Sequence, residues 1–278
     1  MRHLARAILV MAFSTTLAPL ASAQGTAPTT CEPGAEPASH ELTRLLDDAI
    51  SVLRLEPNQA SSFEDLENRL RADDVVARQA KQAVLLALAD QLEAGRVELA
   101  PLQRVLTTYI AARKQLSGTI RGALEQIYTT LDPAQRKRFA ESFAQQFQAE
   151  VQKQLSPEWI DAFATTLKLT DEQKKQLAEM IRNREKSFVG ELDRLGRALG
   201  SFPSDATAFA TSFPQSLDPL FALESALRMV QSTSKISAIL TPEQRALAAD
   251  LLRQRACDPG AEGPAYDYPY SGGFGIFR

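Results

Sequence analysis

Residues 99–131 read LAPLQRVLTTYIAARKQLSGTIRGALEQIYTTL. Large apolar side chains recur here at steps of three and four residues, the spacing of one face of an α-helix. Similar stripes run through residues 139–155 and 177–199, and no apolar–polar alternation typical of a strand persists anywhere. The sequence therefore predicts an all-α fold, an elongated helical bundle or cradle of about seven to nine helices, some long, with disordered termini.

The composition is that of a globular protein. Of the 278 residues, 44% are hydrophobic and 23% are charged, close to the average for folded domains. The net charge of -3 argues against a nucleic-acid-binding protein that depends on neutralising phosphates.

The N-terminus has the pattern of an export signal. Arg2 and Arg6 form a basic region before a largely apolar stretch, and Ala21-Ser22-Ala23 supplies the small-x-small cleavage pattern. We expect residues 1–23 to be a cleaved signal peptide and the product to be soluble and periplasmic, without stable membrane insertion. A membrane anchor is the alternative, which the short apolar stretch disfavours.

Changes in composition divide the rest of the chain. Residues 24–39, rich in Pro, Thr and Ala, are predicted to be a flexible leader. Residues 40–130 and 131–257 are predicted to be two helical regions. Residues 258–278 form a Gly-rich, aromatic tail that either is disordered or docks on a partner or on the protein itself.

The two cysteines bracket the predicted helices. Cys31 lies just before the first helical pattern and Cys257 just after the last. In an oxidising compartment two such thiols usually pair, so we predict a disulfide that ties the two ends of the fold together. Two separate thiols, or pairing between subunits, are the alternatives.

A short pattern recurs at predicted helix starts. Thr or Asp suits the N-cap, and Gln three residues later can bond back to the N–H of the cap, which completes a capping box. The leading Leu then needs a partner in another helix. Weaker echoes begin at Leu55 and Leu99. The motif residues of the two full copies and of one near copy are Leu169, Thr170 and Gln173; Leu240, Thr241 and Gln244; and Leu131, Asp132 and Gln135.

Taken together, these copies resemble the LTxxQ-motif family of small periplasmic helical proteins, the Spy/CpxP group. The resemblance covers residues 165–256, and the region before it, residues 40–165, is either an elaborated or a duplicated unit. It implies an ATP-independent, cofactor-free chaperone-like protein that binds unfolded or misfolded envelope proteins on a helical surface, in some cases as a homodimer. The alternatives are an envelope-stress or metal-responsive accessory that inhibits a sensor partner, and a structural helical adaptor.

Basic clusters are the candidate client surface under this resemblance. An ordinary solvated helix face is the alternative. The Phe139/Phe143/Phe147 stripe is assigned to the core instead, since leaving three Phe side chains exposed would forgo about 1.5–3 kcal/mol each. The basic residues are Arg136, Lys137, Arg138, Lys174, Lys175 and Arg182.

The sequence offers little for catalysis. After removal of residues 1–23, His40 is the only histidine, and neither a Gly-x-Ser-x-Gly elbow nor a Gly-Lys phosphate loop occurs. His40 and Cys31, together with nearby acids, are the candidate metal ligands, but two such residues in a flexible leader do not make a defined site. We therefore expect a protein that is not an enzyme and has no bound metal or cofactor.

Overall fold

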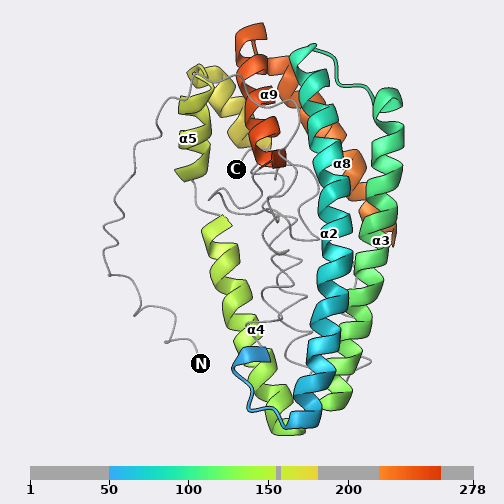
Figure 1. Ribbon diagram of the computed structural model, residues 1–278. Helices are drawn as coiled ribbons and strands as arrows, with labels where there is room; N and C mark the ends of the chain where they lie inside the picture. Colours follow the sequence, from blue (N-terminus) through green and yellow to red (C-terminus); the bar gives the residue numbers. More distant parts are fainter. Residues whose placement is uncertain (1–49, 155–157, 181–218, 258–278) are drawn as a thin grey trace, which may run out of the picture.

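The computed structural model describes residues 50–154, 158–180 and 219–257 (Figure 1). The regular secondary structure in these ranges is helical throughout, which confirms the predicted all-α fold. The predicted signal peptide, leader, disordered termini and aromatic tail lie outside them. The helices are α2 (Pro57–Glu93), α3 (Leu99–Thr130), α4 (Pro133–Gln154), α5 (Glu158–Thr166), α8 (Pro219–Ile239) and α9 (Pro242–Cys257), and residues 171–180 are also helical.

The two longest described helices, α2 and α3, form an antiparallel hairpin (Figure 1). α2 has 37 residues, which corresponds to a length of about 55 Å. It ends at Glu93, and Gly95, two residues further on, has a φ of 74°, a left-handed conformation suited to glycine. A Cβ on Gly95 would lie 3.2 Å from the guanidinium of Arg245, so α9 packs closely against this turn.

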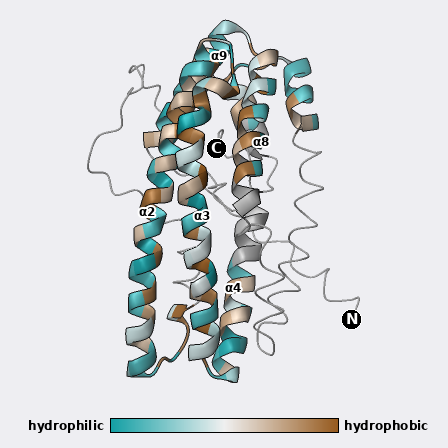
Figure 2. Ribbon diagram, turned by 90° about the vertical axis from the view of Figure 1, so that its right-hand side faces the viewer, coloured by the Kyte–Doolittle hydropathy of each residue, from teal (hydrophilic) through white to brown (hydrophobic). Residues whose placement is uncertain are grey.

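The predicted apolar stripe of α3 faces the core. Leu99 is the exception: it is 49% exposed, because it is the first residue of α3 and lies beyond the packed part of the hairpin. Figure 2 shows hydrophilic and hydrophobic residues alternating along α2 and α3, as expected for helices with one buried face. The buried members of the stripe are Leu102, Leu106, Tyr109, Leu116, Ile120, Leu124 and Ile127.

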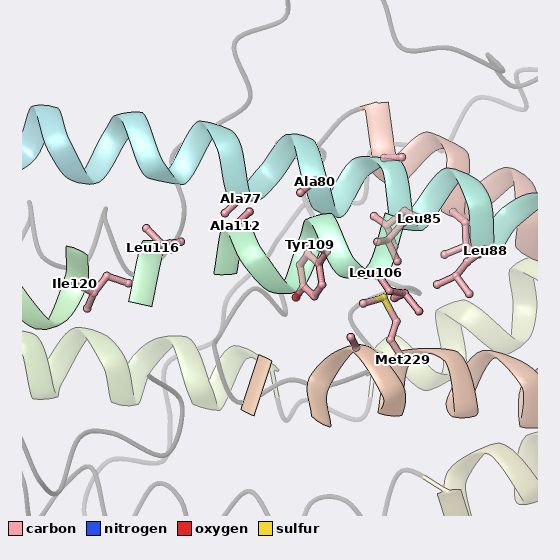
Figure 3. Close-up of a cluster of buried hydrophobic side chains, with 14 of the residues drawn as sticks. Ala77, Ala80, Leu85, Leu88, Leu106, Tyr109, Ala112, Leu116, Ile120 and Met229 are labelled. Carbon is pink, nitrogen blue, oxygen red and sulfur yellow. The ribbon is translucent and has the colours of Figure 1, made fainter. Parts of the chain in front are cut away.

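Small residues let the two long helices approach each other in the middle of the hairpin. Ala77 of α2 lies next to Ala112 of α3, and both are buried (Figure 3). Met229 of α8 enters the same cluster from the other side of α3 (Figure 3). The core is therefore continuous from the hairpin to the C-terminal helices.

α4 contributes two aromatic side chains to the core. Phe139 and Phe143 are 0% and 1% exposed, and their ring centroids lie 6.0 Å apart. The predicted core role of these two residues is confirmed. The side chain of Phe147 lies outside the described residues, as does most of the predicted stripe in residues 177–199.

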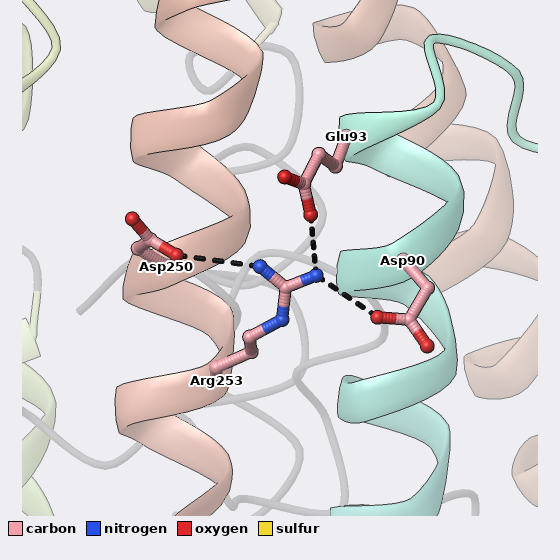
Figure 4. Close-up of polar contacts among 4 residues, drawn as sticks. All are labelled: Asp90, Glu93, Asp250 and Arg253. Atoms are coloured by element: carbon pink, nitrogen blue, oxygen red, sulfur yellow. Dashed lines mark hydrogen bonds and ion pairs between the residues drawn. The ribbon is translucent and has the colours of Figure 1, made fainter. Parts of the chain in front are cut away.

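α9 runs antiparallel to α2 and is held by a charged contact (Figure 4). The Arg253 guanidinium donates to Asp90 at 2.9 Å, to Glu93 at 2.5 Å and to Asp250 at 3.3 Å. Burial opposes the charge of Arg253, but the hydrogen bonds that it donates to Glu93 and Asp90 outweigh this effect and raise the pKa of the guanidinium above its ordinary value. The charged form is therefore the one that links the two helices.

Candidate functional site

The two full copies of the recurrent motif build matching helix starts. The N–H of Gln173 donates to Thr170 Oγ1 at 3.3 Å, and the N–H of Thr170 donates to Gln173 Oε1 at 2.9 Å. Gln244 and Thr241 form the same two bonds, at 3.3 Å and 2.9 Å. Both copies therefore have the predicted capping-box bonds.

The two glutamine side chains also bind each other. Gln173 Nε2 donates to Gln244 Oε1 at 2.7 Å, and Gln244 Nε2 returns a bond to Gln173 Oε1 at 3.1 Å. The second N–H of each amide reaches the carbonyl just before the leading leucine of the other copy, Ile239 O at 2.7 Å and Lys168 O at 3.0 Å. Each amide thus uses both donors and both acceptor positions. We call this reciprocal arrangement a glutamine pair.

A second glutamine pair joins the near copy to the echo at Leu55. Gln59 Nε2 and Gln135 Nε2 donate to each other's Oε1 at 3.0 Å and 3.1 Å. Their second donors reach Thr130 O at 2.8 Å and Arg54 O at 3.0 Å, which again precede the leading leucines.

The helix caps of this second pair follow the same scheme. Asp132 Oδ1 accepts from the N–H of Gln135 at 2.8 Å, and the N–H of Asp132 donates to Gln135 Oε1 at 3.0 Å. The N–H of Glu56 donates to Gln59 Oε1 at 3.0 Å. The four Oε1 atoms of the two pairs therefore each accept one bond from their own cap and one from their partner.

One glutamine of each pair is buried, and its partner, Gln59 or Gln173, is half-buried. Gln135 and Gln244 are 9% and 7% exposed, although an uncharged amide is expensive to bury without partners. The leading leucines beside them, Leu131 and Leu240, are buried in the hydrophobic core, where the sequence predicts that they find partners from other helices. Leu55 and Leu169 are partly buried against the same core.

The two pairs lie at opposite ends of α2 (Figure 1). Gln59 is in the first turn of α2. Gln244 lies at the other end, because its neighbour Arg245 lies against Gly95, just after the last turn of α2. The helix rise between these positions is about 54 Å. The paired glutamines are 76 residues apart in one pair and 71 in the other, so the same joint is built twice with nearly the same length of chain.

Sequence reasoning predicts the caps but misses the pairing. The Gln59–Gln135 pair crosses the boundary predicted between residues 130 and 131, and Gln59 belongs to the weaker echo at Leu55. The signal that could have found the pairs is the fixed offset of Gln from Leu together with the nearly equal spacing of 76 and 71 residues. The echo at Leu99 is different, since Gln103 is exposed.

The predicted basic surface is divided between the two ends of the molecule. Lys137 and Arg138 of α4 are exposed near the Gln59–Gln135 pair, whereas Arg136 is half-buried with its guanidinium carbon 4.3 Å from the centre of the Tyr128 ring. Lys174 forms an ion pair with Asp161 near the Gln173–Gln244 pair, and the neighbouring Lys175 is exposed. Arg182 lies outside the described residues. The described residues of the predicted basic surface therefore form two separate clusters, one near each glutamine pair.

Cys257, the last residue of α9, is disulfide-bonded. Cys31, its predicted partner, lies outside the described residues, as does His40. Within residues 50–154, 158–180 and 219–257, no group of three metal-ligating side chains occurs. No helix of this described part has the length and hydropathy needed to cross a membrane.

The glutamine pairs leave no free amide donor or acceptor for a ligand, so their chemistry is that of a joint between helix ends. The fold and this site together define an all-α protein built on two such joints. The chain matches no protein-family model, no curated protein and no solved structure.

Proposed function

We propose that this protein is an exported, ATP-independent chaperone-like protein that binds unfolded or aggregation-prone envelope proteins on its helical surface. The observation that carries the proposal is the use of the Leu-x-x-x-Gln copies in two matched glutamine pairs. A capping signal alone needs no partner, whereas these copies act together as one repeated architectural element, which supports the resemblance to the LTxxQ-motif family.

The surface of the α2–α3 hairpin is suited to weak and broad binding. Val76 on α2 and Leu99 on α3 are 46% and 49% exposed, and each could bury further apolar area against a client. Exposed cations lie near both ends of the hairpin, Lys137 and Arg138 at one end and Lys175 at the other. Separate apolar and charged contacts of this kind allow moderate binding of many client sequences rather than strong binding of one.

Light scattering of aggregating clients tests the proposal directly. Reduced insulin and a second, chemically denatured enzyme would be mixed with the purified mature protein in the absence of ATP. We expect aggregation to be suppressed at near-stoichiometric ratios. The paired variant Val76→Ser and Leu99→Ser should weaken suppression several-fold, because both side chains lie on the proposed binding surface.

The matched control is Leu247→Ser on α9, which changes a 38% exposed leucine away from the hairpin surface and should leave suppression unchanged. Equal loss in both variants would contradict the hairpin as the binding surface. Absence of suppression with every client would overturn the chaperone proposal itself.

A further inference from the structure

One side of α2 is covered by α9 in its C-terminal half, and α9 does not extend over it further towards the N-terminus of α2. Arg253 of α9 binds Asp90 and Glu93 on this side of α2. Further along the same side, Gln82 binds the carbonyl of Ala256. Gln82 Nε2 donates to Ala256 O at 3.1 Å, so α9 ends beside residue 82 of α2.

The same side of α2 continues beyond the end of α9 as an apolar strip. Residues 93, 90, 86, 82, 79, 75 and 72 follow one another at steps of three and four and therefore share one side of the helix. Ala72 and Gln79 are exposed, Val75 is half-buried, and the adjacent Val76 is 46% exposed. We call Ala72, Val75, Val76 and Gln79 the lower α2 face.

The chain that follows α9 starts at the edge of this face. Residues 258–278 continue directly from Cys257, whose neighbour Ala256 is bonded to Gln82. Ala72 lies ten residues from Gln82, about 15 Å along the helix. The 21 residues of the segment can span up to about 70 Å, so the whole lower α2 face is within reach.

The composition of this segment fits an apolar strip. It carries Tyr266, Tyr268, Tyr270, Phe274 and Phe277, separated mainly by Gly, Pro and Ser. Aromatic rings bury large areas against aliphatic side chains at a low cost in conformational entropy. Because the segment is tethered beside the strip, its effective concentration is on the order of millimolar, and weak contacts are enough for docking.

We propose that the aromatic C-terminal segment, residues 266–277, packs on the lower α2 face of its own chain. The segment occupies the position that α9 would cover if it were longer. A second copy of the protein would have to displace this tethered segment to reach the same strip.

Photo-crosslinking in the full mature chain, with its disulfide intact, tests the proposal. A benzoylphenylalanine introduced at Phe274 would be activated, and the products digested with trypsin. Cleavage after Arg71 and Arg78 releases residues 72–78 as one peptide, which contains most of the lower α2 face. We expect the crosslink on this peptide, in protein of monomer mass.

Two matched valine variants give the control. Val76→Asp should lower the crosslink yield by about tenfold, the factor that corresponds to losing one well-buried apolar contact. Val52→Asp changes a 52% exposed valine outside the face and should leave the yield unchanged. Circular dichroism checks that both variants remain folded.

Three outcomes would overturn the proposal: a crosslink in protein of dimer mass, a crosslink only on other peptides, or an unchanged yield in Val76→Asp. A chain ending at Cys257 gives a separate readout, since uncovering Val76 should increase client suppression. That consequence alone rests on the proposed function. A positive crosslink without client suppression would therefore overturn the function and leave the docking intact.

Discussion

Gln244 has the most demanding environment of the motif residues, because it is 7% exposed and all of its amide hydrogen-bonding positions are used. Gln244→Ala leaves the amide of Gln173, the Lys168 carbonyl and the Thr241 N–H without their partner. We expect the free energy of unfolding to fall by about 2–4 kcal/mol, since each unsatisfied buried group costs about 1–3 kcal/mol and water recovers part of the loss. Urea denaturation measures the change.

The control for this substitution is Gln103→Ala, at the exposed glutamine of the echo that begins at Leu99. It should change stability by less than about 0.5 kcal/mol. The double variant Gln173→Ala with Gln244→Ala should lose less than the sum of the two single losses, by about 1–2 kcal/mol. Simple additivity would contradict the glutamine pair.

Glu243, in the first turn of α9, gives the chain a small acid-sensitive contribution. Hydrogen bonds from its own backbone N–H and from the Thr241 side chain hold the pKa of the Glu243 carboxyl below its usual 4.5. A lowered folded-state pKa means that the contribution is present above pH 4.5 and is lost as the pH falls through the lowered value.

We therefore expect Glu243→Gln to be less stable than the original chain at pH 7, and the two urea midpoints to converge as the pH falls below 4.5. A difference that stays constant down to pH 3 would show that the carboxylate is not the source of the effect. Glu64→Gln, an exposed carboxyl on α2, is the control and should alter the midpoint much less.

At the scale of the elements, α4 depends on its two buried rings. Phe143→Ala removes a side chain that is 1% exposed and stacked on Phe139, so it should cost about 3–5 kcal/mol by lost burial and by the cavity left behind. Leu99→Ala, at a position 49% exposed, should cost less than about 1 kcal/mol. Thermal and urea unfolding of the two variants measure this difference, and similar losses would contradict the burial of the α4 stripe.

Much of this architecture could be predicted from local pattern. The three- and four-residue spacing predicts α3 and the buried side of α4, and the Thr170 and Thr241 caps predict where two helices begin. These features follow from residues close together in the chain, so a single sequence contains the information.

Other features depend on partners far away in the chain. A capping box gives no sign that Gln173 has a partner 71 residues further on. Asp74 is 0% exposed and paired with Arg78 at 3.1 Å, against the rule that the buried side of a helix is apolar. The charged link between Arg253 and Asp90 spans 163 residues, and only the three-dimensional arrangement brings its members together.

At the scale of the whole molecule, the end of α9 carries a covalent constraint. Cys257 is disulfide-bonded, and its predicted partner is Cys31. Alkylation of the native protein should add no mass to either cysteine, whereas reduction followed by alkylation should modify both. Because the closed loop would be long, reduction should lower the free energy of unfolding by up to about 5 kcal/mol.

Intact-mass measurement and urea denaturation, each with and without reductant, check these two expectations. Peptide mapping without reduction should recover the two cysteines in one linked peptide pair. A protein of doubled mass that reverts on reduction would instead place the bridge between two copies.

The glutamine pairs have a consequence for how the chain can change during evolution. In a reciprocal amide pair each member is both donor and acceptor for the other, so a substitution at one position removes one of the reasons for keeping the second. When sequences of relatives are aligned, we expect positions 173 and 244 to vary together, and positions 59 and 135 likewise. The two pairs lie at opposite ends of α2 and share no residue, so they should drift independently of each other. Paired replacements at one end of the molecule would then occur without paired replacements at the other.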